Sequence, residues 1–282
     1  MFTIKNPTLS IALHDPLDGF YQGTRFDRSG VFDSILFQGT EMAGRWFDSY
    51  DPLMHDAVCG PSEEFTPVFL DRGLVKIGVG LLDVPSAQEY DHFKLYGIAD
   101  PGEWECFQDS SSVTFRHRLP GVYLYEKVVA LTGEGSFEIR HRLCSELDLK
   151  GEVYNHNFFT FDKMSVGPSR EIDFPFRPIG SWRSEYDSVG FTESGVRFTR
   201  TLQKGESVYT GDIHKTADGM PYDIALSEAG RFRVNIRSSA PCTHTVMWSN
   251  YRIACPEPYN VFESAPGKDF LWTISYRITP LS

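Results

Sequence analysis

The feature that most constrains the fold of this sequence is a repeated alternation of apolar and polar residues with a period of two. Residues 113–119, 137–143, 231–237 and 270–276 each place apolar or aromatic side chains on one side and mostly charged or polar ones on the other. Successive side chains of a β-strand point to opposite faces of its sheet. The pattern therefore predicts half-buried antiparallel strands.

Turn signals separate these strands, and long amphipathic helical patterns are nearly absent. With 24 Gly and 17 Pro spread over 282 residues, few windows could hold three helical turns. The sequence predicts an all-β fold, a large antiparallel β-sandwich. No linker, charge block or repeat divides it, so we expect one domain over residues 1–282. The turn signals are Ser29-Gly30, Pro120-Gly121, Gly133-Glu134-Gly135, Ala229-Gly230 and Pro266-Gly267.

The charge and the apolar pattern exclude several classes of partner. A net charge of -11 without any basic cluster disfavours nucleic acid and anionic membrane surfaces. No stretch approaches the roughly 18 apolar residues of a membrane-spanning helix. The apolar stretch near the N-terminus ends at His14 and Asp15, which is too short for a secretory signal of about 7–15 apolar residues. We expect a cytoplasmic protein that binds a neutral small molecule.

The cysteines do not suggest a metal site or a disulfide framework. Five cysteines without CxxC spacing are typical of buried free thiols in a reducing compartment. We therefore expect neither a disulfide framework nor a zinc site among them. The cysteines are Cys59, Cys106, Cys144, Cys242 and Cys255.

Two segments contain residues suited to proton transfer. In the first, Asn155, His156 and Asn157 precede two phenylalanines at an expected strand end. A histidine with an unperturbed pKa near 6.5 can give or take a proton, although a core or turn histidine would also fit. In the second, Glu257 lies between Pro256 and Pro258, which would fix the direction of its carboxylate. A general base and an ordinary surface-loop glutamate are both compatible with this pattern.

Taken together, these segments resemble the galactose mutarotase-like (aldose 1-epimerase) superfamily. The resemblance is carried by YNHNFF, by ACPEPYN and by the C-terminal ESAPGKDFLWTISYRI, in that order. The early GTRFDRSGVFDSILFQGTEM is similar to the opening hairpin of that superfamily. The resemblance extends roughly from Gly23 to Ile278.

The resemblance implies a supersandwich fold with a sugar cleft, and it assigns a role to each group. His156 matches the general acid and Glu257 the general base of an aldose 1-epimerase. Such an enzyme removes the proton of the C1 hydroxyl and protonates the ring oxygen, so that the ring opens and recloses on the other face. This chemistry needs no metal and no organic cofactor, so the resemblance implies neither. We therefore expect these two side chains to face each other across a gap one pyranose ring wide.

Further positions are candidates for sugar contacts. Asp223 resembles a ligand-binding aspartate of the superfamily, but it could also cap a turn. His55 lies near a segment, GPSEEF, that departs from the usual pattern. Within it, Glu63 and Glu64 could bind hydroxyl groups or begin a short helix capped by Ser62. Arg25, Lys76 and Asn155 complete the candidate substrate-binding residues, and Arg25 and Lys76 could contact a phosphate.

Three functions remain open at this point. The leading hypothesis is an aldose 1-epimerase acting on a free sugar. A hexose-phosphate 1-epimerase would need Arg or Lys beside the cleft, and a non-catalytic carbohydrate-binding protein could use the same scaffold. The expected partner is a small-molecule sugar, and the sequence is also compatible with a homodimer.

Overall fold

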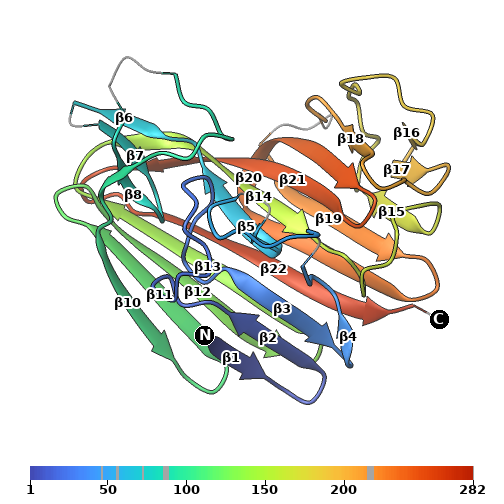
Figure 1. Cartoon of the computed structure of the whole chain (residues 1–282), viewed down its shortest axis with the longest axis horizontal. Coiled ribbons are helices and arrows are strands. Elements are labelled where there is room, and N and C mark those ends of the chain that lie inside the picture. Colours follow the sequence, from blue (N-terminus) through green and yellow to red (C-terminus); the bar gives the residue numbers. More distant parts are fainter. Residues whose placement is uncertain (46, 55–56, 72, 85–88, 215–218, 282) are drawn as a thin grey trace.

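The computed structural model describes the chain except for residues 46, 55–56, 72, 85–88, 215–218 and 282 (Figure 1). The described residues contain no α-helix and form strands β1 to β22. No helix in this part of the chain could cross a membrane. The strands are β1 (Phe2–Lys5), β2 (Leu9–Leu13), β3 (Phe32–Phe37), β4 (Thr40–Glu41), β5 (Gly60–Phe65), β6 (Val68–Leu70), β7 (Gly73–Lys76), β8 (Gly80–Leu82), β9 (Ile98–Asp100), β10 (Glu103–Gln108), β11 (Ser112–Leu119), β12 (Tyr123–Gly133), β13 (Ser136–Ser145), β14 (Leu149–Phe158), β15 (Arg170–Asp173), β16 (Val189–Phe191), β17 (Gly195–Phe198), β18 (Ser207–Tyr209), β19 (Pro221–Glu228), β20 (Phe232–Asn250), β21 (Ala254–Ser264) and β22 (Phe270–Pro280).

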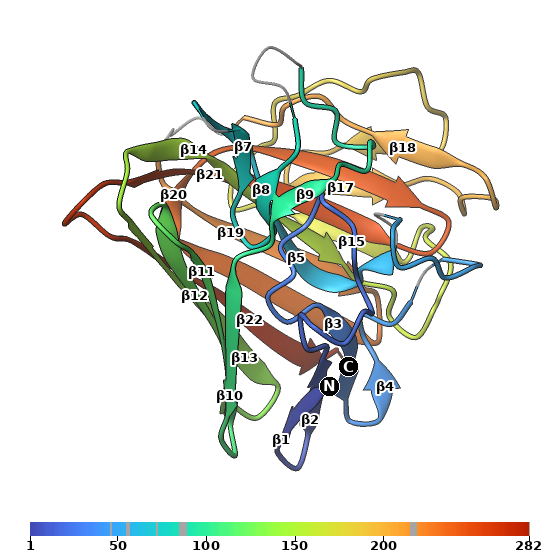
Figure 2. The ribbon, with the colours of Figure 1, turned by 60° about the vertical axis from the view of Figure 1, so that its left-hand side comes forward.

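The predicted all-β antiparallel architecture is confirmed. One long sheet has the order β10-β11-β12-β13-β22-β20-β19-β15-β17-β16, and β5, β14, β21 and β18 branch from it. Two four-stranded sheets, β1-β2-β3-β4 and β6-β7-β8-β9, complete the fold. Figures 1 and 2 show β5, β14 and β21 lying over the broad layer that contains β12, β13 and β22.

Strand β20 connects the two layers because its halves pair with different neighbours. Residues Phe232–Ser238 pair with β22, whereas Cys242–Ser249 pair with β21. The register of β20 against β21 shifts between Cys242 and Thr245. An irregularity of this kind bends a strand, so it can leave one layer and enter the other. The second layer, β5-β14-β21-β20, carries most of the candidate site residues.

The strands expected from the alternation are present, with the expected faces buried. In β11 and β13 the odd-numbered positions 113–119 and 137–143 are buried, including His117 and His141. Trp272, Ile274 and Tyr276 are buried in β22. The expected Ser29-Gly30 turn has Gly30 at φ 63°, where a Cβ atom would also lie 2.3 Å from the Phe115 ring.

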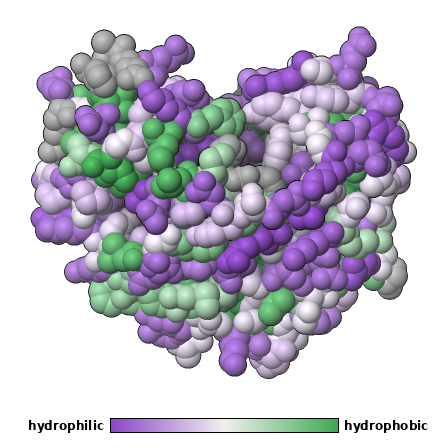
Figure 3. Space-filling view, in the orientation of Figure 1, coloured by the Kyte–Doolittle hydropathy of each residue, from purple (hydrophilic) through white to green (hydrophobic). Residues whose placement is uncertain are grey.

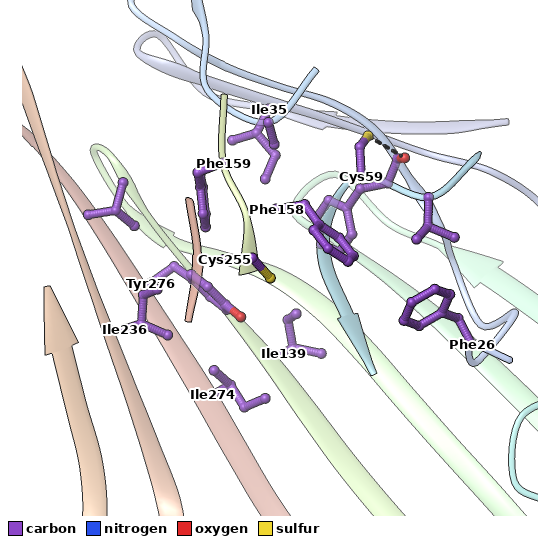
Figure 4. Packing of buried hydrophobic residues seen from close by; sticks show 14 of the residues in the cluster. Phe26, Ile35, Cys59, Ile139, Phe158, Phe159, Ile236, Cys255, Ile274 and Tyr276 are labelled. Carbon is purple, nitrogen blue, oxygen red and sulfur yellow. Dashed lines mark hydrogen bonds between the residues drawn. The ribbon is translucent and has the colours of Figure 1, made fainter. Parts of the chain in front are cut away.

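The hydrophobic core lies between the layers and extends beneath the N-terminal sheet. Figure 4 shows Ile139, Ile274 and Tyr276 of the broad layer packing toward Phe158 and Cys255 of the β14–β21 layer. All five cysteines lie within the described residues, where none forms a disulfide and three are buried.

Candidate acid–base site

Strands β5, β14 and β21 bring the two predicted catalytic residues together. Tyr154 pairs with Tyr259 across the β14–β21 ladder, and their rings stack with centroids 4.3 Å apart. His156 lies two residues after Tyr154 in β14, and Glu257 lies two residues before Tyr259 in the antiparallel strand β21. The Nδ1 atom of His156 lies 3.1 Å from Oε1 of Glu257.

Prolines interrupt the ladder next to this contact. Pro256 and Pro258 have no backbone N–H to donate across the sheet. The side-chain amide of Asn157 donates instead to the Pro256 carbonyl at 2.9 Å, and the Asn157 backbone N–H donates to Sγ of Cys255 at 3.2 Å. These bonds hold β14 and β21 together where regular pairing ends. Glu257 itself lies inside β21 and not in a surface loop.

Glu64 is the centre of the charged groups around His156. One carboxylate oxygen lies 2.6 Å from Nε of Arg25 and 3.3 Å from Nε2 of His156. The other lies 2.6 Å from Nδ1 of His92 and 3.8 Å from Nζ of Lys76. The imidazole of His156 thus lies between two carboxylates, Glu64 and Glu257.

The electrostatic environment favours the charged forms of Glu64 and His156 but not that of Lys76. Burial alone would raise the pKa of Glu64, but Arg25 and Lys76 outweigh it and hold that pKa well below its usual value. Burial lowers the pKa of His156, but the charges of Glu257 and Glu64 more than compensate and raise it. For Lys76 burial prevails over Glu64 and lowers the pKa to about 8.

The site opens toward His92 and Arg25. The side chains of His156 and Glu257 are only 1% and 6% exposed, whereas that of His92 is 45% exposed. The Arg25 guanidinium lies over the rings of Phe26 and Phe93, 4.8 and 5.1 Å from their centroids. The expected ring-wide gap is absent, because His156 and Glu257 are in direct contact.

A surface pocket of about 230 Å³ adjoins this edge of the site. Arg25 and His92 line both the pocket and the Glu64 cluster, and Phe93 and Leu95 form part of its exposed apolar wall. In Figure 3 the upper edge of the molecule is indented between the part containing β6–β8 and the part containing β16–β18. A ligand would approach His156 from the side of His92.

A second buried polar cluster lies on the opposite face of β5. Glu63 contacts Nζ of Lys127 and lies 3.5 Å from Nε2 of His141, and the Asn155 amide donates to it at 3.4 Å. Lys127 also lies 3.4 Å from the Asp27 carboxylate. Glu63 and Asn155 therefore contact the core of the sandwich and not the face that carries His156.

The other predicted substrate-binding positions fall in three places. Arg25, Lys76 and Glu64 lie beside His156. Asp223 lies on the outer face of β19, where Arg237 donates to it at 2.9 Å, and within the part of the chain that the structure describes no hydrogen bond or ion pair joins it to His156. His55 lies outside the described residues.

One local expectation needs correction. The segment that contains Glu63 and Glu64 is the strand β5 and not the first turn of a helix. Its register against β14 opposes Tyr154 to Glu64 and His156 to Ser62, so backbone pairing with a neighbouring strand overrides the local capping pattern around Ser62. Lys76 ends β7 and is buried, where its ammonium group lies 3.8 Å from the Glu64 carboxylate and donates to the Phe65 carbonyl at 2.5 Å.

His92 is the site residue that the sequence analysis missed. Its Nδ1 atom lies within hydrogen-bond distance of both Glu64 and the Tyr154 hydroxyl, the latter at 3.1 Å. It belongs to an irregular segment, residues 91–97, without the strand alternation that identified other positions. Only its position beside an exposed aromatic residue, Phe93, could have drawn attention to it.

Solved structures similar to this one share its whole architecture. A candidate aldose 1-epimerase from Escherichia coli K12 matches with a TM-score of 0.62 and 14% identity, over 99% of both chains. A galactose mutarotase related enzyme from Lactobacillus acidophilus matches with a TM-score of 0.55 and 15% identity, over 100% of this chain and 97% of that one. Galactose 1-epimerase from Lactobacillus acidophilus NCFM matches with a TM-score of 0.52 and 10% identity, over 99% of this chain and 94% of that one.

No known family model and no curated protein matches this sequence. At identities this low, the structural likeness establishes the fold. For the architecture, this confirms the resemblance that was inferred from YNHNFF, ACPEPYN and the C-terminal strand.

Proposed function

We propose that this chain, which has the galactose mutarotase-like fold, is an aldose 1-epimerase that interconverts the α and β anomers of a sugar. The observation that carries the proposal is the contact between His156 and Glu257 at 3.1 Å on adjacent strands. The pair lies beside Glu64, whose partners Arg25 and His92 line the pocket. The names of similar structures, which include aldose and galactose 1-epimerases, support the same reaction class.

The spacing of the pair suits the chemistry of a hemiacetal. The hydroxyl oxygen to be deprotonated and the ring oxygen to be protonated are bonded to the same carbon, so the base and the acid must be neighbours. Glu257 takes the proton of the C1 hydroxyl while protonated His156 gives its proton to the ring oxygen, and the C1–O5 bond breaks. After rotation about C1–C2, His156 takes the O5 proton back, O5 attacks C1, and Glu257 returns its proton to O1.

Glu64 holds the acid in its protonated form. Its negative charge, 3.3 Å from Nε2, favours the imidazolium that must donate to the ring oxygen. Arg25 and Lys76 in turn keep Glu64 ionised. The sugar would displace the direct His156–Glu257 contact as it enters beside His92.

The arrangement favours a free sugar over a hexose phosphate. Arg25 and Lys76 were the candidate phosphate contacts, and both lie against Glu64. Their charges are therefore offset by a buried carboxylate. A phosphate at this position would have to compete with Glu64 for both cations.

The test is the rate at which a freshly dissolved α-anomer mutarotates, followed by polarimetry or NMR over a panel of aldoses. We expect the protein to accelerate this rate for at least one of them. Glu257→Gln and His156→Asn should each reduce the acceleration by about 10²-fold or more. Asp223→Asn, on the outer face of β19, is the matched control and should leave the rate unchanged.

A protein that only binds carbohydrate would behave differently. It would bind a sugar in calorimetry or by protein fluorescence without accelerating mutarotation of that sugar. Full activity in both Glu257→Gln and His156→Asn would also refute the proposed roles.

A further inference from the structure

Cys255 is buried beside the acid–base pair, and the proposed reaction does not use it. One ligand atom each from Cys255, His156 and Glu257 lie within 4.8 Å of one another, and all three residues are buried. Thiolate, imidazole and carboxylate are the ligand types that Zn²⁺ prefers. Bond lengths of about 2.0–2.3 Å require the three atoms to move together by roughly an ångström.

A second observation points to a ligand at this place. Both ring nitrogens of His156 are buried and lack a hydrogen-bond partner of good direction, although carboxylate oxygens lie at ion-pair distance. Buried polar atoms are seldom left in this way. The backbone N–H of Asn157 donates to Sγ of Cys255 at 3.2 Å, a contact that stabilises a sulfur carrying negative charge.

We propose that Cys255, His156 and Glu257 form a binding site for a thiophilic divalent cation such as Zn²⁺, and that its occupation blocks the acid–base pair. The inhibition rests on the proposed function, whereas the binding does not. Binding replaces the thiol proton by a Zn–S bond and releases that proton to solvent, together with a second proton when His156 is charged. The positive charge of Arg25, which acts on Cys255, His156 and Glu257, opposes the cation.

The binding is tested with Co²⁺, whose thiolate complexes absorb through a sulfur-to-metal charge-transfer band. We expect the reduced wild-type protein to show this band on titration with Co²⁺, and Zn²⁺ to displace it. Cys255→Ala and the isosteric Cys255→Ser should lose the band and weaken Zn²⁺ binding by more than about tenfold. Cys242→Ala, which replaces a buried cysteine outside the cluster, should keep both the Co²⁺ band and the Zn²⁺ binding.

Inhibition is tested separately with Zn²⁺ and a chelator in the mutarotation assay. Wild-type activity should fall with Zn²⁺ and return with chelator, whereas folded Cys255→Ser should resist Zn²⁺. A Cys255 variant that binds Co²⁺ with an unchanged band would overturn the site. If the protein proves inactive, the Co²⁺ titration still decides whether the cation binds, so failure of the site and of the proposed function are distinguishable.

Discussion

Glu63 and Glu64 are adjacent in the sequence and point to opposite faces of β5, where different cations bind them. Glu63 contacts Lys127 beneath the sheet, and Glu64 contacts Arg25 above it. Both carboxylates are fully buried. A one-residue step along one strand thus supplies a charge to the core network and another to the candidate site.

Glu64→Gln should destabilise the protein strongly, because it leaves the charges of Lys76 and Arg25 without their buried partner. Removing one member of a buried ion pair costs about 3–5 kcal/mol, measurable by urea denaturation. Glu263→Gln, on the exposed end of β21 beside Lys268, should change stability by less than about 0.5 kcal/mol. The double variant Glu64→Gln, Lys76→Met should recover part of the loss. If the effects of Glu64→Gln and Lys76→Met on the unfolding free energy add up in the double variant, Glu64 and Lys76 are not coupled.

His92→Ala should weaken sugar binding more than it slows the chemical step. His92 is half exposed at the opening, so its loss removes a contact without leaving a buried cavity. We expect KM to rise by about tenfold with kcat changed much less, as for a lost hydrogen bond to a charged partner. Lys268→Ala, at an exposed lysine that does not line the pocket, serves as the control. A fall in kcat at unchanged KM would instead place His92 in the proton transfer.

His117 should make the stability of the protein depend on pH between about 4 and 6.5. Burial lowers its pKa to about 4, while Nε2 lies 2.8 Å from the Pro101 carbonyl and the Tyr123 hydroxyl lies 2.9 Å from Nδ1. In this pH window the unfolded chain binds a proton at His117 and the folded protein does not, so stability rises with pH. A contribution of about 3 kcal/mol is complete above pH 6.5 and is lost as the pH falls through 6.5 to 4.

Urea denaturation at pH 4.5 and 7 measures this dependence. The difference between the unfolding free energies at the two pH values should be smaller in His117→Gln than in the wild type. His214→Gln, at an exposed histidine, should keep the wild-type difference. An unchanged difference in His117→Gln would mean that other groups cause it.

The sequence alone determined the architecture and the types of the reacting groups. A period of two in segments such as 137–143 predicts strands with one buried face, because alternate side chains of a strand are forced to opposite sides. The order of YNHNFF and ACPEPYN identified His156 and Glu257 before any contact between them was known.

The tertiary structure alone decided which charges surround that pair. Pairing of β14 with β5 on one side and β21 on the other places Glu64 and Glu257 on either side of His156. Asp223, assigned by the same resemblance, lies on an outer face instead. A strand's own sequence fixes which of its residues share a face. Register and layer order depend instead on long-range pairing, and they set the distances between residues from different strands.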